Sequence, residues 1–576
     1  MMKNRDIADI FEKTSHLLEI RGDNIHRVLS YRRAAENILA HGRELADMRE
    51  AGEDLTSISG IGQTLADKIN ELLDTGQLEF YQRLTAEMPA SLLDMMRVDG
   101  FGPKRIKLVY EKLGITTLDE LEQAAKNGNL RDLPRMGAKS EEKILHNIQA
   151  LKQFGDDRYP LGDALPLAKQ ILQTLSALPQ VKNTAVGGSA RRYSETVGDL
   201  DLLVAAEEAD AEVVMEAFCT HPLAEEVALR GPTKSRIILP NGLGADLRVL
   251  PPQNWGTLLS YFTGSKAHNV RLRELAQKQG LSLNEYAFTN TATDEKIICA
   301  TEEQVYQTLG LPYIVPQLRQ DLGEIEAAQN GNLPVLIQRS DIVADLHMHT
   351  TWSDGKLSVL EMAREAKRRG YQYIAITDHS QSLTIANGLT VEQLRQQAKE
   401  IAAANDELGP DFRILHGTEM EIKADGTLDF PDDVLAELDW VIAALHVSLT
   451  QPRVQVMERI MTALHNPHVD MIAHPTGRLL PKRPGADLDM EEVLNTAVAT
   501  NTILEINANP RRLDLKDSYV RRALELGVKL AINCDAHRAS HFDLLHYGIG
   551  TAQRGWATAA QVVNTWPLEK LIRRNE

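Results

Sequence analysis

The sequence predicts a multidomain protein of mixed α+β and α/β class. At about 150 residues per domain, its 576 residues correspond to roughly four domains. Three patterns divide the chain: glycine turns followed by amphipathic helices in the first third, short strands with aspartates in the middle, and repeated strand–helix units after residue 340. Hydrophobic residues make up 43% of the chain, so each part can bury a core.

The composition restricts the compartment and the partners. The three cysteines are far apart and cannot form a disulfide framework, which indicates a reducing compartment. No apolar run approaches the about 18–20 residues that span a bilayer, and the N-terminus lacks the apolar stretch of a signal peptide. We therefore expect a cytoplasmic protein with no membrane partner. The net charge of −18 argues against a nucleic-acid partner unless local sites bind it.

Three similar elements occupy the first third, at residues 58–69, 98–109 and 133–144. Each combines an apolar residue, a Gly-x-Gly turn or its variant, and an amphipathic helix, and each resembles a helix-hairpin-helix. The glycines let backbone amides at the helix N-terminus contact DNA phosphates without a net positive charge. The alternative is an ordinary helix cap followed by a second helix. The expected DNA-binding residues are Gly60, Gly62, Gly100, Gly102, Lys104 and Arg105.

The middle of the chain carries a cluster of carboxylates. Residues 185–204 predict a strand, a Gly-Gly-Ser turn, a short helix and a second strand, on which Asp199 and Asp201 share one face. Asp246 lies in another strand-like run. Three such acids repel one another unless divalent cations neutralise them, which is the requirement of two-metal phosphoryl transfer and favours Mg²⁺. The turn, with Ser189, Arg191 and Arg192, offers donors to a triphosphate.

The segment after residue 340 predicts a closed or nearly closed barrel. Short apolar runs alternate with amphipathic helices, at residues 359–369, 454–464 and 519–526 for example, which is typical of parallel strand–helix units. The predicted strands are residues 342–346, 373–377, 412–415, 441–445, 470–473, 503–506 and 529–532.

Imidazoles and carboxylates follow these strands. The carboxyl ends of parallel strands share one mouth, so we expect the side chains to converge there. Histidine and carboxylate donors without cysteine suit Zn²⁺, Mn²⁺ or Fe²⁺, and about nine of them could hold two or three ions for phosphoester hydrolysis. Any one histidine could instead be structural. The candidate ligands are His347, His349, Asp354, His379, Glu419, His446, His474, Asp535 and His537.

The same segment resembles the PHP (polymerase and histidinol phosphatase) superfamily. The resemblance rests on the motifs at residues 345–355, 377–380, 417–419, 444–446, 473–475 and 534–537. It implies a distorted (β/α)₇ barrel, a trinuclear metal site held by the nine candidates, and an active phosphoesterase. We interpret five other residues as structural or surface residues: Glu421, His416, His465, His468 and His541.

Residues 261–273 and 283–286 resemble the thumb of family X DNA polymerases, and the spacing from Ser189 to the aspartates matches that family. The resemblance implies that Asp199, Asp201 and Asp246 bind Mg²⁺ or Mn²⁺, with Asp246 helping to activate the primer 3′-hydroxyl. For Tyr261, ordinary helix packing is the alternative. The implied nucleotide-binding residues are Gly188, Ser189, Arg192, Tyr261, Gly264, Asn269 and Arg273.

Lys68 matches the place of a lysine that forms a Schiff base with an abasic sugar in some members of family X. An exposed helix lysine is normally a solvated charge, and only a lowered pKa would make it a useful nucleophile. Lyase activity at Lys68 is therefore a separate hypothesis from polymerisation.

The resemblances together cover the whole chain. We expect a nucleoid-associated monomer that fills gaps in gapped or nicked DNA with dNTPs, while the PHP domain trims 3′ ends as a 3′–5′ exonuclease, 3′-phosphodiesterase or abasic-site endonuclease. The alternatives are an end-processing phosphodiesterase with weak synthesis and a non-catalytic DNA-end binding module. The expected domains are 1–85 and 86–155 (helix-hairpin-helix), 156–255 (palm), 256–315 (thumb), 316–340 (linker) and 341–576 (PHP).

Overall fold

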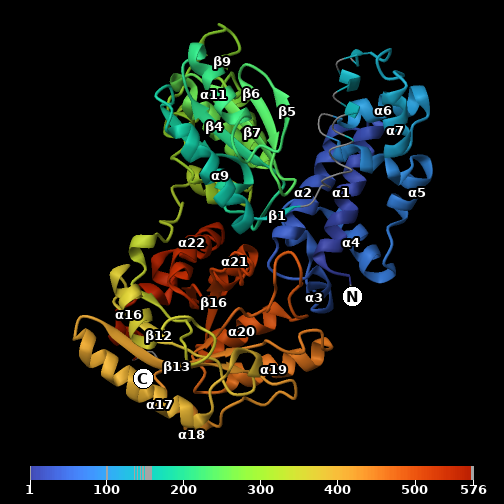
Figure 1. The fold of residues 1–576 in the computed structure, drawn as a ribbon. Coiled ribbons are helices and arrows are strands. Elements are labelled where there is room, and N and C mark those ends of the chain that lie inside the picture. Colours follow the sequence, from blue (N-terminus) through green and yellow to red (C-terminus); the bar gives the residue numbers. More distant parts are fainter. Residues whose placement is uncertain are drawn as a thin grey trace. The chain divides into compact units, whose positions relative to one another are not determined.

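The computed structural model describes residues 2–98, 101–134, 136–138, 140–142, 144–145, 148 and 158–572. The chain forms two compact units (Figure 1). Unit 1 comprises Met1–Arg158 with Ile238–Leu243, and unit 2 comprises Tyr159–Ile237 with Gly244–Glu576. Across the described residues, no helix combines the length and the apolar character that crossing a membrane requires.

Unit 1 is helical, and its helices pack around two apolar cores. Glycines in the left-handed region end several of them; Gly22, for example, follows the first helix with φ 87°. The helices are α1 (Asn4–Arg21), α2 (Ile25–Ala40), α3 (Leu45–Glu50), α4 (Gln63–Thr75), α5 (Glu79–Glu87), α6 (Pro103–Leu113) and α7 (Leu118–Lys126).

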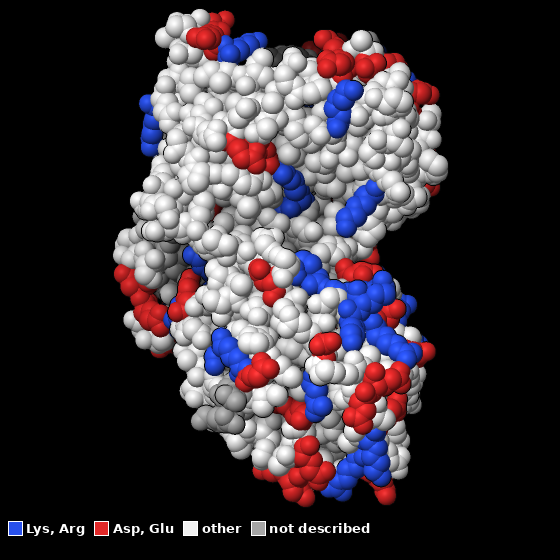
Figure 2. All heavy atoms as spheres, turned by 90° about the vertical axis from the view of Figure 1, so that its left-hand side faces the viewer, with Lys and Arg blue, Asp and Glu red and all other residues white. Residues whose placement is uncertain are grey.

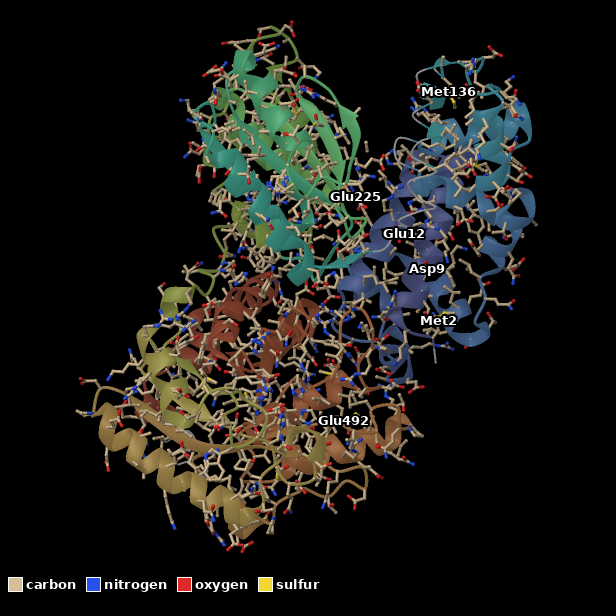
Figure 3. The ribbon with its side chains drawn as sticks, in the orientation of Figure 1. Met2, Asp9, Glu12, Met136, Glu225 and Glu492 are labelled. Atoms are coloured by element: carbon tan, nitrogen blue, oxygen red, sulfur yellow. The ribbon has the colours of Figure 1, made fainter. Side chains whose placement is uncertain are left out.

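The three predicted hairpin elements share one backbone turn. The N–H of Ile61 donates to the carbonyl of Ile58 (3.0 Å), and equivalent bonds join Phe101 to Val98 (2.9 Å) and Met136 to Leu133 (3.0 Å). Met136 is labelled in Figure 3. Gly62 and Gly102 are the N-caps of α4 and α6. The predicted helix-hairpin-helix fold is confirmed; Gly100, one of the expected DNA-binding residues, lies outside the described residues.

The palm, as we call the sheet domain after residue 158, is built on five strands in the order β2-β4-β7-β6-β5. Its central pair, β4 and β7, is parallel and places Asp201 opposite Asp246. Leu200 and Leu202 are fully buried, as the alternation predicts. The elements are α9 (Leu161–Ser176), β2 (Asn183–Val186), α10 (Gly188–Arg191), β4 (Leu200–Ala205), α11 (Ala211–Cys219), β5 (Glu226–Arg230), β6 (Lys234–Ile238) and β7 (Gly244–Leu250).

The thumb follows the palm and contains a buried ionic network. Glu302 bonds Arg319 (2.6 Å) and Arg191 (2.7 Å), and His268 contacts Glu324 (2.6 Å). The segment 316–340, predicted as a linker, contains the helix α15 (Glu324–Gln329) and packs on this core, because Arg319 and Glu324 are fully buried. The other elements are α12 (Trp255–Thr263), α13 (Lys266–Lys278), β8 (Leu281–Leu283), β9 (Phe288–Asn290), β10 (Lys296–Ile297) and α14 (Glu302–Thr308).

The barrel has parallel strands in sequential order, and all seven predicted strands are confirmed. A parallel bridge between Met348 and Ala536 joins the segments that directly follow the first and the last strand, so the sheet nearly closes. Its strands are β11 (Ala344–Asp345), β12 (Tyr373–Ile376), β13 (Arg413–Glu421), β14 (Trp440–Ala444), β15 (Met471–Ile472), β16 (Ile503–Asn507) and β17 (Leu530–Asn533). Its main helices are α16 (Val359–Arg368), α17 (Val391–Leu408), α19 (Arg453–His465), α20 (Met490–Thr500), α21 (Asp517–Leu526) and α22 (Leu545–Arg554).

Strand β13 differs from its prediction, which ended at residue 415. The strand continues to Glu421 because its first half pairs with β12 and its second half with β14. Gly417 lies at the change of partner, where a Cβ would come within 2.3 Å of the carbonyl oxygen of Trp440. Polar residues such as Thr418 and Glu419 hid this second half from a search for apolar runs, although both are buried.

One face of the molecule carries both basic and acidic side chains. Figure 2 shows basic and acidic side chains interspersed over that face. Two basic residues of α16 are ion-paired with acids: Arg364 with Glu407, and Arg368 with Glu365. An anionic ligand is therefore more readily bound at particular sites than by a broad basic surface.

Candidate functional site

The barrel brings all nine predicted ligand side chains to one mouth. Two come directly after β11, one after each of β12, β14 and β15, and two after β17. Glu419 lies within β13 and Asp354 in the loop that follows β11. His347 and His349 are fully buried, whereas the Asp354 side chain is 33% exposed. The cluster is thus enclosed on the barrel side and open at one edge.

Glu419 occupies the middle of this cluster. Its two carboxylate oxygens lie 2.9–3.5 Å from a ring nitrogen of each of five imidazoles: His347, His349, His379, His446 and His474. Burial opposes ionisation of Glu419, but His446, His347 and His379 outweigh it and hold its pKa well below the usual value. A permanent carboxylate therefore faces the imidazoles.

Asp535 and Asp354 complete the cluster. Oδ1 of Asp535 lies 3.2 Å from Nε2 of His349 and 3.5 Å from Nδ1 of His537. Oδ1 of Asp354 lies 3.3 Å from Nε2 of His537 and 3.8 Å from Nε2 of His379. These two carboxylates and the imidazoles between them form a second set of donors beside that of Glu419.

This donor set fits more than one metal ion. Three overlapping groups have ligand atoms within 4.8 Å of one another: His349, Asp354, His379 and His537; His347, His349 and Asp535; and His379, Glu419 and His446. Within the described part of the chain, the buried Nδ1 atoms of His349 and His474 have no hydrogen-bond partner. Buried imidazoles with unbonded nitrogens, beside carboxylates and without thiolates, suit borderline divalent metals.

Carboxylates behind the imidazoles fix their orientation. Glu505 on β16 lies 2.8 Å from Nδ1 of His347 and also accepts the backbone N–H of His474 (2.7 Å). Glu421 lies 2.6 Å from Nδ1 of His446. Each contact leaves the other ring nitrogen facing the cluster, which is how carboxylates support metal-binding histidines. Glu421, interpreted from sequence as structural or surface, is thus a buried neighbour of a candidate ligand.

Sequence reasoning missed Glu505 altogether. Its signal was a charged residue inside the apolar run 503–506, and it is fully buried. Asp378 belongs to the predicted motif at residues 377–380, but no role was predicted for it. It accepts hydrogen bonds from Thr350 (2.7 Å) and Gln397 (2.6 Å) and so supports the loop that leads to Asp354. Burial raises the pKa of Asp378 against these bonds.

The palm brings the three predicted aspartates together. Asp201 and Asp246 are neighbours on β4 and β7. Burial, with added repulsion from Asp199 and Asp246, raises the pKa of Asp201 to about 7. Divalent cations relieve the cost of holding a buried carboxylate beside two others, so Mg²⁺ or Mn²⁺ fits here.

Two basic side chains accompany the aspartates. Nη1 of Arg236 lies 2.8 Å from Asp246 and 3.8 Å from Asp199, and Nζ of Lys234 lies 3.3 Å from Asp246. Neither was predicted, because a half-buried arginine on a strand carries no sequence signal of its own. Both partly neutralise the acids.

The glycine turn before α10 approaches these acids closely. Gly188 has φ +57°, and a Cβ there would come within 2.2 Å of a carboxylate oxygen of Asp201. Ser189 follows in α10, and Arg192 donates to the carbonyl of Thr263. Arg191, expected to offer donors to a triphosphate, instead pairs with the buried Glu302. The turn is therefore tied to both the aspartates and the thumb.

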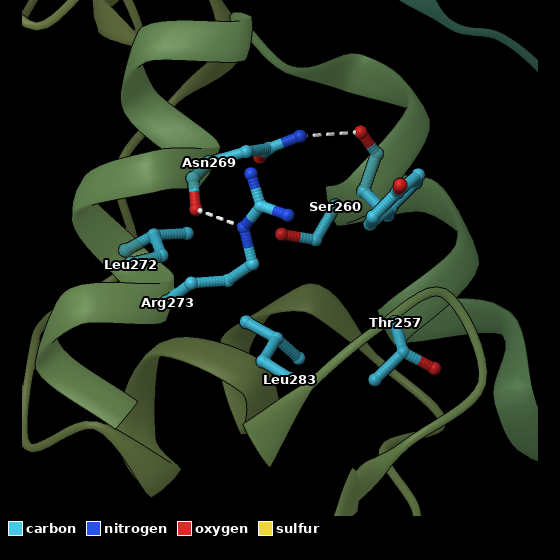
Figure 4. A pocket seen from close by; sticks show the side chains of 7 residues that line it. Thr257, Ser260, Asn269, Leu272, Arg273 and Leu283 are labelled. Atoms are coloured by element: carbon cyan, nitrogen blue, oxygen red, sulfur yellow. Dashed lines mark hydrogen bonds between the residues drawn. The ribbon is translucent and has the colours of Figure 1, made fainter. Parts of the chain in front are cut away.

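The thumb gathers three of the remaining predicted nucleotide-binding residues, Tyr261, Asn269 and Arg273, around a small pocket (Figure 4). Nδ2 of Asn269 donates to the backbone carbonyl of Tyr261 (2.7 Å), and Arg273 donates to that of Asn269 (3.3 Å). Gly264 ends α12 with φ +66°, close to the guanidinium of Arg192. The other pocket-lining residues are Thr257, Ser260, Leu272 and Leu283.

The expected DNA contacts of unit 1 lie on exposed turns. Gly60, Gly62 and Gly102 are exposed, and Lys104 projects from the first turn of α6. Lys68 on α4 is half-buried, with Nζ 5.1 Å from the centroid of the Phe80 ring. Unit 1 thus presents amides and positive charge at the same helix N-terminus.

Comparisons with known proteins agree with this geometry. Family models match residues 2–78 (helix-hairpin-helix domain), 92–149 (SAM-like helix-hairpin-helix tandem), 258–320 (DNA polymerase beta thumb) and 345–509 (PHP domain). Two probable phosphatases match part of the chain. One, from Thermoanaerobacter sp., is 31% identical over 39% of this chain and 91% of its own, and one from Caldanaerobacter subterraneus is 32% identical over 34% of this chain and 76% of its own.

One relative matches over the whole of both chains. This chain is 41% identical to the DNA polymerase/3′–5′ exonuclease PolX of Bacillus subtilis over 100% of both chains. No segment of either protein is left outside the match. This chain therefore belongs to the bacterial PolX family, the family X DNA polymerases with a PHP domain and 3′–5′ exonuclease activity.

Proposed function

We propose that this chain fills short gaps in damaged DNA at the aspartate centre of the palm and removes 3′-terminal nucleotides or blocking groups at the histidine centre of the barrel. The observation that carries the proposal is that one chain assembles both donor sets, three carboxylates in one place and nine imidazoles and carboxylates in another. The full-length similarity to a polymerase with an exonuclease supports both halves.

At the palm, the chain's own residues orient the reactants. Amides of the turn at Gly188, with Ser189 and Arg192, hold the triphosphate, while Asp246 lies where it can accept the proton of the primer 3′-hydroxyl. Mg²⁺ or Mn²⁺, when bound by the three aspartates, supplies the positive charge that phosphoryl transfer requires. Arg236 must then leave Asp246, with which it now pairs at 2.8 Å.

The thumb residues select the incoming nucleotide. Tyr261 lies beside the position of the sugar and disfavours ribonucleotides, while Asn269 and Arg273 contact the minor-groove side of the new base pair. The bond from Asn269 to the Tyr261 backbone keeps these side chains in one arrangement. Gly264 lets the end of α12 approach Arg192.

At the barrel, the nine candidate ligands would hold two or three Zn²⁺, Mn²⁺ or Fe²⁺ ions when these are bound. Such ions supply an activated water and neutralise phosphate oxygens. Glu505 and Glu421 keep the Nε2 atoms of His347 and His446 directed into the cluster. The open edge at Asp354 admits the DNA end.

Unit 1 holds the phosphates of the DNA. Backbone amides after Gly62 and Gly102, with Lys104 and Arg105, contact the backbone without reading sequence. This explains how a chain with a net charge of −18 binds DNA. Lys68 is proposed separately as the amine of a lyase reaction on abasic sugars.

The proposal is tested on gapped DNA with a 5′-labelled primer that carries either a free or a blocked 3′ end. We expect extension by a few nucleotides from the free end, and unblocking before extension from the other. Asp199→Ala should abolish gap filling and leave unblocking intact. If the wild-type protein extends the primer weakly but removes the block rapidly, the result would instead favour an end-processing phosphodiesterase with weak synthesis. Absence of both would favour a DNA-end binding module.

A further inference from the structure

Two arginines lie at the barrel mouth without any role among the candidate ligands. Arg512 is in the loop after β16, and its Nε is 3.8 Å from Oδ2 of Asp535, which is beyond hydrogen-bond distance. Arg483 is in the loop after β15 and donates to the carbonyl of Gly477 (2.8 Å). Within the described part of the chain, Arg483 forms no ion pair with a carboxylate.

The two loops are fastened to each other. Arg478 in the first donates to the carbonyls of Arg512 (2.8 Å) and Leu513 in the second. In return, the buried carboxylate of Asp514 accepts the N–H groups of Thr476 (3.0 Å) and Gly477 (2.9 Å). These reciprocal bonds fix the backbones that carry the two arginines, so their positions are set by the fold.

Their shared location has an electrostatic cost. Burial, followed by the charge of Arg512, lowers the pKa of Arg483. The Arg512 side chain is only 16% exposed. Two like charges that act on each other at a partly buried place are destabilising unless an anion lies beside them. Among the described residues, Asp514 and Asp535 are the carboxylates near Arg512, and both already have partners. Asp514 accepts the loop N–H groups, while Oδ1 of Asp535 faces His349 and its Oδ2 accepts a bond from Asn507 (3.2 Å).

We propose that Arg483 and Arg512 bind the phosphodiester at the DNA 3′ end and position it against the histidine centre. Guanidinium groups form paired hydrogen bonds to phosphate oxygens, which fixes the orientation of the bond to be cleaved. Arg512 beside Asp535 directs that phosphate to the cluster. The proposal rests on the proposed function of the barrel.

The test uses the full-length protein with Arg483→Gln, Arg512→Gln and Arg512→Lys. Arg511→Gln is the matched control, because Arg511 is the neighbour in the same loop but its exposed side chain pairs with Asp163 at 3.1 Å. Four quantities are measured for each variant: KM and kcat for degradation of a 5′-labelled single-stranded oligonucleotide, the affinity for inorganic phosphate by calorimetry, the bound metal, and the rate of primer extension.

We expect each glutamine variant to raise the oligonucleotide KM and the phosphate dissociation constant by about tenfold to a hundredfold, as loss of charge-assisted hydrogen bonds does. Arg512→Lys should fall between Arg512→Gln and the wild type, because lysine keeps the charge but loses the paired bonds. Metal content and primer extension should not change, which also shows that the variants fold. The Arg511→Gln variant should match the wild type.

Unchanged KM and phosphate affinity in the Arg483 and Arg512 variants would overturn the proposal. A weaker phosphate affinity that occurs together with a loss of bound metal would also overturn it, since Arg512 would then only support Asp535. Failure of the proposed function is distinguishable: the wild-type chain would then not degrade the oligonucleotide, whereas the phosphate affinities would still decide the role of the two arginines.

Discussion

The aspartate centre of the palm and the histidine centre of the barrel differ in donors, burial and neighbours. The palm offers three carboxylates, of which the Asp199 side chain is 46% exposed, and it places Arg236 and Lys234 against them. The barrel offers imidazoles and carboxylates that are mostly buried, with Glu505 and Glu421 behind two of the imidazoles.

The difference indicates two ways of using metals. A site built from carboxylates alone binds Mg²⁺ weakly and shares it with substrate phosphates, so arginine and lysine can neutralise the empty site between turnovers. Buried imidazoles oriented by second carboxylates hold transition metals more firmly, as a resident part of the protein. Four predictions would break or sharpen this comparison.

The largest expected effect is loss of synthesis in Asp246→Ala. Removing a carboxylate that both holds cations and orients the primer hydroxyl should lower the extension rate by about 10³-fold or more. Degradation of a 3′ end should be unchanged. Rates are measured on gapped DNA, with the exposed acid variant Glu208→Ala as control. Parallel loss of degradation would show that the two centres are not separate.

Metal removal should distinguish the centres next. After treatment with a chelator and its removal, Mg²⁺ alone should restore extension at once, whereas degradation should stay below about a tenth until Mn²⁺ or Zn²⁺ is added. Metal analysis of the protein before and after treatment checks that the loss of degradation follows the loss of bound metal. Full recovery of both activities with Mg²⁺ alone would contradict the distinction between Mg²⁺ that is shared with the substrate and transition metals that stay bound to the protein.

Glu505→Gln should have an intermediate effect. The change weakens the contact that orients His347, so metal affinity or degradation should fall by about 10- to 100-fold, while extension is unaffected. Glu492→Gln, at an exposed position labelled in Figure 3, is the matched control. Metal titration of both variants measures the effect. Equal behaviour of the two would mean that Glu505 only fills space in the barrel.

The smallest effect is expected in unit 1. Lys104→Ala should weaken binding to gapped DNA only a few-fold and lower the slope of log affinity against log salt by about 1, since one phosphate contact is lost. Fluorescence anisotropy at several salt concentrations checks this. The exposed lysine of another helix, Lys126→Ala on α7, should leave the slope unchanged. A flat salt response of the wild type would contradict phosphate contacts altogether.

The sequence predicted much of the barrel but less of what surrounds its centre. The seven strands were predictable because buried parallel strands are short apolar runs, and the nine candidate ligands because they follow those runs. Glu505 was not, because its contact with His347 joins residues 158 positions apart. The second half of β13 was missed because its buried residues are polar, and the pairing of Arg236 with Asp246 depends on two strands lying side by side.

The central claim, that one chain holds two separate centres acting in turn on a DNA 3′ end, is tested most directly by mixing two inactive variants. The substrate is gapped DNA with a blocked 3′ end. Asp199→Ala should only unblock it, and His347→Ala with His349→Ala should only extend an unblocked control. Mixed together, the two variants should restore complete gap filling. Failure of the mixture, although each variant keeps its single activity, would contradict the account.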